Sequence, residues 1–479
     1  MGIIPLVNNY LRMDMKNRKL PFVMGMISFM AAASVNAAPY TSTNTCIAHM
    51  KSHLSSDSST LTLNNCGMTD EDVPAITNFL SQHLAVTDLE LAGNKITAVG
   101  ASQLASSAIK QYNFDNNSLG DDGVVALTKN PNIQSFSAVN NNISDVGANA
   151  LAKEFLTSLN LSKNKLTSVG LQALLSNSKL TRLYLAYDVL DQAALTALAN
   201  TGLASLDVSY DDIGDSGLAT LAAMKHVTFL DISGDHISNQ GIFSLTTQNH
   251  GLNSLIAENN QITADGVHLL VNNEDGLHGI DLTNNQIGDE GAAALNGLIL
   301  SSALLIGGNH VTDKGIAKLL QNGSGMLIQL SAENNQITDA SVPALSRINQ
   351  LVLDGNQIDD AGAAIFAKAK EMYSLSLARN KISDTGAISL ASARLASLDL
   401  SGNQIGDSGA TALAGATFKS LGLAHNTVGD DGAIALSSSK TITWLNISYN
   451  AIGTAGVKAL QTDMQLNYLN LKGNPGYSS

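Results

Sequence analysis

A polar residue recurs along this chain at a nearly constant spacing, and this repeat constrains the fold more than any other feature. Eighteen such positions run from Cys66 to Asn474 with a mean spacing of 24 residues. We call them the ladder positions and number the repeats by them. They are Cys66, Asn94, Asn117, Asn141, Asn164, Asp188, Asp211, Asp235, Asn260, Asn285, Asn309, Asn335, Asn356, Asn380, Asn403, Asn426, Asn450 and Asn474.

The segment Leu398–Ala414, with the sequence LDLSGNQIGDSGATALA, shows the repeating unit. Leu398 and Leu400 alternate as they do in a strand, where side chains two residues apart share a face. The ladder residue Asn403 follows, and Ala410–Ala414 is a run of good helix formers. Neither so short a strand nor so short a helix buries its apolar face alone, so the repeats must cover one another.

The pattern L-x-x-L-x-L-x-x-N-x-I-x-D-x-G-A-x-x-L resembles the leucine-rich repeat. The form is the helical one seen in ribonuclease-inhibitor-like proteins and in leucine-rich-repeat effectors of intracellular bacteria, and the match covers roughly residues 61 to 474. The resemblance implies an α/β fold of about eighteen repeats. It is a right-handed leucine-rich-repeat solenoid (horseshoe) with a parallel sheet on the concave face and short helices on the convex face.

Two features depart from the repeat pattern. Three ladder positions hold Asp, and the spacing is uneven from Asn309 to Asn356, where a step of 26 residues is followed by one of 21. The short step contains Pro343 and predicts a shortened convex helix there, because proline is tolerated in a first helical turn.

The first 37 residues have the layout of a secretory signal. Positive charges at Lys16, Arg18 and Lys19 precede an apolar run over residues 20–33, and small residues follow up to Ala37. A membrane anchor or a buried helix is the alternative, but the run is shorter than the ~18 residues of a spanning helix and contains Pro21. We therefore expect residues 1–37 to be a signal peptide, 38–60 an N-terminal cap and 61–479 the leucine-rich repeat domain. The protein would be exported, to the medium, the periplasm or the cell surface.

The chain is acidic, with a formal net charge of −14. An acidic surface repels phosphate groups, so the charge argues against nucleic acid and against anionic membranes as partners of the mature protein. Acidity also keeps a long molecule soluble, and this simpler explanation accounts for the charge without any partner.

The chain has two cysteines, and both lie near the start of the repeats. Cys66 occupies the first ladder position and Cys46 lies on the predicted cap. An exported chain permits a disulfide between them that joins the cap to the first repeat. Cysteine is also an accepted substitute for asparagine at this position, so two free thiols are an equally good interpretation.

Repeats six to eight contain the densest group of aromatic and acidic residues. Tyr184, Asp207 and Asp231 are expected to align on the concave face, because strand residues that alternate with the buried ones point there. Tyr187 and Tyr210 follow where the strands end. Tyrosine supplies both contact area and a hydroxyl, so these five residues are our candidate protein-binding patch.

The same repeats carry the three ladder aspartates, Asp188, Asp211 and Asp235. Asparagine at the ladder can accept and donate hydrogen bonds, and we expect it to satisfy the backbone of its own repeat and of the next. A carboxylate cannot donate. Either water replaces the lost bonds, or the stacked carboxylates bind a cation such as Ca²⁺. We favour the first interpretation, because no D-x-D-x-D-G loop accompanies the cluster, and we predict no metal and no cofactor.

No catalytic motif stands out, so we do not expect an enzyme. The chain lacks G-x-x-x-x-G-K-[ST], H-E-x-x-H and G-x-S-x-G. Solenoids offer extended surfaces for binding. The expected function is that of an exported bacterial leucine-rich-repeat protein, a monomer, that binds another protein through its concave face. The resemblance adds that it is a host-directed effector. The alternative is a periplasmic or cell-surface structural or binding protein that recognises peptide or polysaccharide.

Overall fold

The computed structural model describes residues 43–105, 107–152, 156–249, 251–272, 277–298, 303–321, 327–462 and 465–477. The predicted signal peptide and the first five residues of the predicted cap lie outside these ranges. The repeats fall into a first unit, which ends at Gln261, and a second unit, which begins at Ile262. Within the described ranges, no helix has both the length and the apolar character that crossing a membrane requires.

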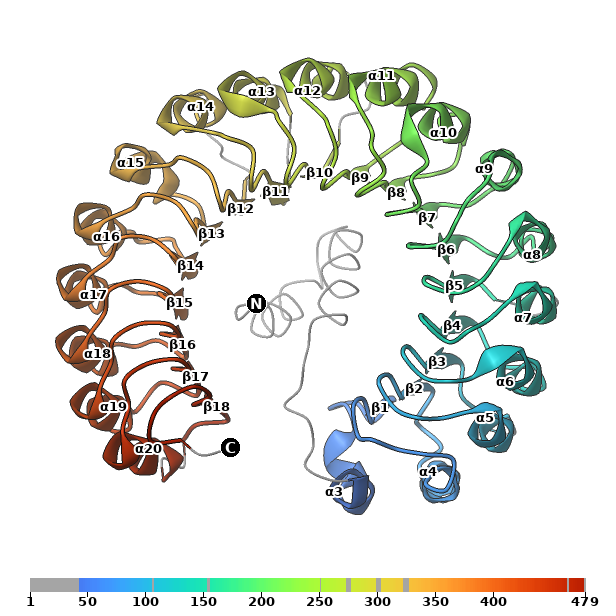
Figure 1. Ribbon diagram of the computed structural model, residues 1–479, viewed down its shortest axis with the longest axis horizontal. Coiled ribbons are helices and arrows are strands. Elements are labelled where there is room, and N and C mark those ends of the chain that lie inside the picture. The colour runs from blue at the N-terminus through green and yellow to red at the C-terminus, as the bar shows by residue number, and fades with distance from the viewer. Residues whose placement is uncertain are drawn as a thin grey trace. The chain divides into compact units, whose positions relative to one another are not determined.

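In the first unit, strands and helices alternate along the chain, and the strands line one side while the helices line the other (Figure 1). The strands are β1 (Thr60–Thr62), β2 (Asp88–Glu90), β3 (Gln111–Asn113), β4 (Ser135–Ser137), β5 (Ser158–Asn160), β6 (Arg182–Tyr184), β7 (Ser205–Asp207), β8 (Phe229–Asp231) and β9 (Ser254–Ile256). The helices are α3 (Thr43–Ala48), the 3₁₀ helix η1 (Met50–His53), α4 (Val73–Gln82), α5 (Ala98–Leu104), α6 (Gly120–Leu127), α7 (Asp145–Leu151), α8 (Ser168–Leu174), α9 (Gln192–Ala199), α10 (Gly214–Leu221) and α11 (Asn239–Gln248).

The second unit repeats this arrangement (Figure 1). Its strands are β10 (Gly279–Asp281), β11 (Ala303–Leu305), β12 (Gln329–Ser331), β13 (Gln350–Val352), β14 (Ser374–Ser376), β15 (Ser397–Asp399), β16 (Ser420–Gly422), β17 (Trp444–Asn446) and β18 (Tyr468–Asn470). Its helices are α12 (Ala264–Val271), α13 (Gly288–Ala294), η2 (Leu295–Gly297), α14 (Asp313–Leu319), η3 (Asp339–Ser341), α15 (Val342–Leu345), α16 (Asp360–Phe366), α17 (Asp384–Leu390), α18 (Asp407–Ala414), α19 (Asp430–Leu436) and α20 (Thr454–Gln461).

Neighbouring strands within each unit are parallel and in strict register. Leu398 in the middle of β15 pairs with Leu421 of β16, and that residue's neighbour across the sheet is Leu445 of β17. All three are at most 1 % exposed, because the helices cover this face of the sheet. The first and last residues of each strand point to the other face. The predicted α/β solenoid of leucine-rich repeats, with one strand for each of eighteen repeats in the described part of the chain, is confirmed.

The ladder asparagines bind the backbone of their own repeat and of the preceding one. Oδ1 of Asn426 accepts a hydrogen bond from the amide of Ile405, one repeat earlier, at 3.0 Å. Its Nδ2 donates to the carbonyl of Leu400 in that repeat at 2.9 Å and to the carbonyl of Leu423 in its own at 3.2 Å. Our expectation that asparagine serves the next repeat was wrong in direction, because the turn that needs these bonds lies on the N-terminal side.

A second polar column, which we call the turn spine, lies where each strand leads into its helix. Asp360 Oδ1 accepts the amides of Ser383 and Gly386, in the next repeat, at 2.8 and 2.9 Å, and its Oδ2 accepts the Ser383 hydroxyl at 2.5 Å. The hydroxyl in turn caps helix α17 by accepting the amide of Thr385. Its aspartates are Asp70, Asp121, Asp145, Asp215, Asp289, Asp313, Asp339, Asp360, Asp384, Asp407 and Asp430.

The N-terminal cap is joined covalently to the first repeat. A disulfide links Cys46 of α3 to Cys66 at the first ladder position, with the two Cα atoms 6.1 Å apart. Both sulfur-bearing residues are buried. The bridge holds the cap on the first repeat, at the end where a solenoid otherwise exposes its apolar interior.

The uneven spacing in repeats eleven to thirteen has the predicted effect on a helix. The convex segment of repeat twelve is only the 3₁₀ helix η3 and the four-residue helix α15, which has Pro343 in its first turn. The three residues by which this step of 21 falls short of the mean spacing of 24 are thus taken from the helix, and β12 and β13 keep their register.

Candidate functional site

The predicted patch residues of the strands do align across the sheet. Tyr184 of β6 is the register partner of Asp207 of β7, which in turn pairs with Asp231 of β8. The two carboxyl groups, however, bend back onto their own repeats. Asp207 Oδ1 accepts from the amide and hydroxyl of Ser209 at 2.9 and 2.7 Å, and Asp231 does the same with Ser233 at 3.0 and 2.7 Å.

Burial limits what these carboxyls can offer a partner. Asp231 is 5 % exposed, whereas Tyr184 and Asp207 are half-buried. Loss of solvent raises the pKa of Asp207, and its bonds to Ser209 offset part of that rise. Asp231 therefore belongs to the structure of its turn, and the accessible part of this strand surface is Tyr184 with Asp207.

Tyr187 and Tyr210 stack on each other at the strand exits. Their ring centroids are 4.5 Å apart and the planes differ by 7°. Both residues have positive φ angles, 62° and 61°, at the position just before the ladder residue. Asn or Gly holds this left-handed position in many other repeats, as expected from their tolerance of it. In repeats six and seven this turn directs a large side chain outward.

Neighbouring repeats hold the two rings in place. Lys163 Nζ lies 4.2 Å from the Tyr187 ring centroid, in a cation–π contact. The Tyr210 ring covers Gly234, where a Cβ would lie 2.4 Å from the ring. The Tyr210 hydroxyl accepts a hydrogen bond from Asn259 Nδ2 at 2.8 Å. These five residues form what we call the aromatic row.

The aromatic row is accessible as well as ordered. Tyr187 is 49 % exposed and Tyr210 is 37 % exposed. The faces of Tyr187 are covered by Lys163 and by Tyr210, so the row presents ring edges and hydroxyls. Partial burial and the nearby Glu258 raise the pKa of the Tyr210 hydroxyl, which stays a neutral donor and acceptor at physiological pH. Lys163, Gly234 and Asn259 were not among the predicted patch residues, although all three occupy the same repeat position as the tyrosines.

A related stack lies in the second unit. His425 and Tyr449 hold the same repeat position, with centroids 4.4 Å apart, and Tyr449 covers Gly473. Trp444 and Tyr468, which begin β17 and β18, stack separately at 4.8 Å. The pattern of two rings followed by a glycine therefore occurs in both units.

The three ladder aspartates lie beneath the aromatic row and are more buried than its rings. Asp188 and Asp211 are each 6 % exposed and Asp235 is fully buried. Burial raises the pKa of Asp188 to about 7, of Asp211 to about 10 and of Asp235 to about 7. No group of three or more His, Cys, Asp or Glu side chains with the spacing of a metal site occurs in the described ranges.

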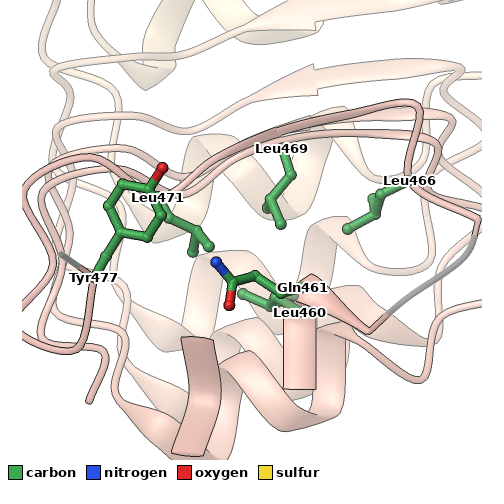
Figure 2. A pocket seen from close by; sticks show the side chains of 6 residues that line it. All are labelled: Leu460, Gln461, Leu466, Leu469, Leu471 and Tyr477. Atoms are coloured by element: carbon green, nitrogen blue, oxygen red, sulfur yellow. The ribbon is translucent and has the colours of Figure 1, made fainter. Parts of the chain in front are cut away.

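The described residues also form a pocket of about 300 Å³ beside the last strand, shown in Figure 2. It is lined by Leu460, Gln461, Leu466, Leu469, Leu471 and Tyr477. Leu469 of β18 is half-buried, whereas its register partner Leu445 is 1 % exposed. The lining is the apolar interior of the last repeat and carries no cluster of titrating groups.

A model of the family described as "Leucine Rich repeat" matches seven segments of the chain, residues 85–105, 153–175, 277–295, 373–391, 395–414, 416–437 and 438–460. The matched segments lie in both units, and each falls on one strand-and-helix repeat. No curated protein matches the sequence at a significant level.

Several solved structures resemble the chain in fold. An internalin (inlF) from Listeria monocytogenes is 21 % identical with a TM-score of 0.32, over 77 % of this chain and 88 % of that one. The ectodomain of the Arabidopsis thaliana receptor kinase GASSHO1/SCHENGEN3, in complex with CASPARIAN STRIP INTEGRITY FACTOR 2, is 15 % identical with a TM-score of 0.40, over 82 % and 59 % of the two chains. TLR13 in complex with ssRNA13 is 18 % identical with a TM-score of 0.48, over 81 % and 60 %.

The latter two chains are longer proteins, of which this chain spans about three fifths. The family match, the 24-residue period and the one-strand, one-helix repeats with an inward polar ladder all lead to the same assignment. The chain is a leucine-rich-repeat protein.

Proposed function

We propose that this protein is a non-enzymatic scaffold that binds another protein, with the aromatic row of the first unit as the main contact. The observation that supports this most is the exposed, stacked pair Tyr187 and Tyr210. Aromatic side chains contribute much of the energy of protein interfaces. Stacking fixes these rings before a partner arrives, so little side-chain entropy is lost on binding.

The geometry favours a protein over a polysaccharide. A sugar ring packs on an open aromatic face, and the faces of Tyr187 are already occupied by Lys163 and Tyr210. The row offers ring edges and hydroxyls, which suit the mixed polar and apolar surface of a protein or peptide. The net charge of −14 gives no support for a phosphate-rich partner.

We propose further that the protein is exported. The charged, apolar and small-residue regions of residues 1–37 support this, and so does the Cys46–Cys66 disulfide, because disulfides persist mainly in oxidising compartments. The resemblance to effectors of intracellular bacteria supports a bacterial, host-directed role. A periplasmic or cell-surface protein is the second candidate. Cell fractionation separates the two, since the first places the protein in host cytosol and the second retains it in the envelope.

The binding proposal is tested by capturing partners from host-cell and envelope extracts with the full-length mature protein. Tyr187→Ala/Tyr210→Ala is the test variant. Val169→Ala, which alters a 68 % exposed residue on helix α8, is the matched control on the helix side. We expect the double variant to weaken binding of a captured partner by about thirtyfold, the effect of losing a contact of 2 kcal/mol, and the control to bind normally.

Circular dichroism checks that the wild type, the double variant and the control have the same fold. A double variant that is folded and keeps every partner at wild-type affinity would contradict the assignment of the row.

A further inference from the structure

The three ladder aspartates accept a hydrogen bond as asparagine does but lack its donor bonds. Oδ1 of Asp188 accepts the amide of Asn164 at 3.1 Å, Oδ1 of Asp211 accepts the amide of Asp188 at 2.6 Å, and Oδ1 of Asp235 accepts the amide of Asp211 at 2.8 Å. Each bond reaches the preceding repeat, as at the asparagine positions. The first oxygen of each carboxyl therefore performs the accepting role of asparagine.

The second oxygen has no partner that a carboxylate can use. Oδ2 of Asp188, Asp211 and Asp235 is buried in all three cases and receives no hydrogen bond. At the preceding ladder position, Nδ2 of Asn164 instead donates to the carbonyls of Ala138, Leu161 and Ser162 at 2.9, 2.8 and 3.2 Å. An ionised Oδ2 in the equivalent position would face several backbone carbonyl oxygens. All of these atoms are acceptors, so no hydrogen bond could form between them.

A proton on Oδ2 resolves this conflict. A neutral carboxylic acid has one acceptor oxygen and one O–H donor, which is the hydrogen-bonding pattern that asparagine offers here. Burial also penalises the charged form, and the penalty is greater where three carboxyls are stacked. Oδ2 is shielded from solvent in all three aspartates, so a donor bond from the acid itself replaces the lost bonds without the water that the sequence interpretation required.

We propose that Asp188, Asp211 and Asp235 are held as neutral carboxylic acids that donate from Oδ2 to the turn carbonyls, and that they make repeats six to eight an acid-stabilised segment. Loss of these protons to solvent removes the donor bonds and leaves buried charges. The repeats then loosen as pH rises. In this proposal, what the three ladder aspartates bind is a proton each.

The surrounding charges act in the same direction. Asp235, Asp188 and Asp207 raise the pKa of Asp211, because each places a like charge nearby. Asp207 raises the pKa of Asp235 in the same way. Asp231 of β8 adds another carboxyl on the same sheet face.

Several other titratable groups in or beside these repeats have partners of their own. Lys163 lies over Tyr187, and His236 is paired with Asp212 at 2.7 Å on the surface. Asp191 accepts the amide of Ala194 at the start of α9, and Asp215 belongs to the turn spine. Arg182 of β6 and the hydroxyls of Tyr187 and Tyr210 lie on the exposed side.

The turn spine supports only the junction from repeat seven to repeat eight of this segment, through Asp215. Repeats five and six hold Ser168 and Gln192 where other repeats have the spine aspartate, and Asp191 bonds within its own repeat. The junctions from repeat five to seven therefore depend mainly on the ladder. Ionisation of the ladder is expected to act first on these junctions.

The direction in which pH changes stability follows from the raised pKa values of the three aspartates. An unfolded aspartate has a pKa of about 3.9. Between that pH and the folded pKa values, about 7 for Asp188 and Asp235 and about 10 for Asp211, the folded state binds more protons than the unfolded state. The contribution of these groups to stability is thus full below about pH 4 and is lost as pH rises through these values.

The test compares the wild type with Asp188→Asn/Asp211→Asn/Asp235→Asn, using the full-length mature chain between pH 5 and 9. In the wild type, after correction for intrinsic exchange, hydrogen exchange of peptides from repeats six to eight should accelerate by about tenfold per pH unit over part of this range. The triple variant should abolish this acceleration and lose the infrared C=O band of protonated carboxylic acids. Asp212→Asn, at an exposed carboxyl, is the matched control and should behave as the wild type does.

Unchanged pH dependence in a folded triple variant, or absence of the acid band from the wild type at pH 7, would overturn the proposal. A reciprocal variant covers the case in which the triple variant does not fold. Asn426→Asp places a carboxyl at a 9 % exposed ladder position of the second unit, and it should lower the melting temperature at pH 8 relative to pH 5. Equal melting temperatures at the two pH values would also count against the proposal.

Discussion

At the scale of single residues, the turn spine explains why glycine recurs six positions after the ladder residue. The glycine that follows the ladder residue by six positions, such as Gly386, donates its amide to the spine aspartate of the preceding repeat. A Cβ there would lie 2.5 Å from Asp360 Oδ1. The close approach of this backbone to a carboxylate is therefore what requires glycine, since its φ angle is ordinary.

Replacement of Gly386 by alanine should destabilise the second unit by about 1–3 kcal/mol, the usual range for overpacking. Denaturant titration followed by circular dichroism measures the change. Gly202→Ala is the control, because no heavy atom lies within 4 Å of a Cβ at that position. It should be neutral or slightly stabilising, through a lower entropy of the unfolded chain. Equal losses in the two variants would show that spine packing is not the reason for the glycine.

At the scale of elements, the N-terminal cap is the part that does not follow the repeat. Helix α3 carries only six residues, too few to be stable without packing partners. The Cys46–Cys66 bridge spans 20 residues and holds this helix on the first repeat. The cap is therefore the element whose order depends most on the redox state.

Reduction of the disulfide, or the variant Cys46→Ser/Cys66→Ser, should remove about 3 kcal/mol from the stability of the cap, the value expected for a loop of this length. Limited proteolysis should then cut within residues 43–66 and leave later repeats intact. The oxidised protein supplies the control. Equal resistance of the two forms would show that packing alone holds the cap.

Much of this architecture could be predicted from sequence, because many copies of one residue pattern all predict the same strand and helix. The strands, the buried ladder and the alignment of Tyr184 with Asp207 follow directly from alternation and period. The direction of the ladder bonds did not follow, since a period is symmetric with respect to the preceding and the next repeat. The aromatic row was only partly visible, because stacking depends on the left-handed turn at Tyr187 and Tyr210.

Burial of individual polar groups was also hidden from the sequence. Asp207 and Asp231 occupy outward strand positions, and nothing in their spacing shows that Ser209 and Ser233 close over them. The turn spine was missed for another reason. The recurrence of an aspartate in each turn does not show that its carboxylate accepts hydrogen bonds from the next repeat.

At the scale of the whole molecule, each unit is a stack in which a repeat touches its neighbours, so stability is distributed along the chain. Export of the full chain is the proposal that belongs to this scale. If residues 1–37 are removed, the mature protein should begin at Ala38 and carry a net charge of −17, since four basic residues and one acidic residue are lost. N-terminal sequencing of the protein from its source cells checks this. An intact N-terminus together with free thiols would contradict export.

The central claim is that each ladder residue stabilises the repeat before it. Asn335 Oδ1 accepts the amides of Asn309 and Val311 in the preceding repeat at 3.0 and 2.9 Å. The amide of Ile337, in its own repeat, instead donates to Asn356 at 3.0 Å. Asn335→Ala therefore separates the two directions within one molecule.

Amide-resolved hydrogen exchange on the folded Asn335→Ala variant is the most direct measurement. Loss of these bonds leaves buried amides unpaired, at about 1–3 kcal/mol, so exchange at residues 309 and 311 should accelerate by about tenfold or more. Exchange at residue 337 should stay close to the wild-type rate. Acceleration at residue 337 with no change at residues 309 and 311 would contradict the account.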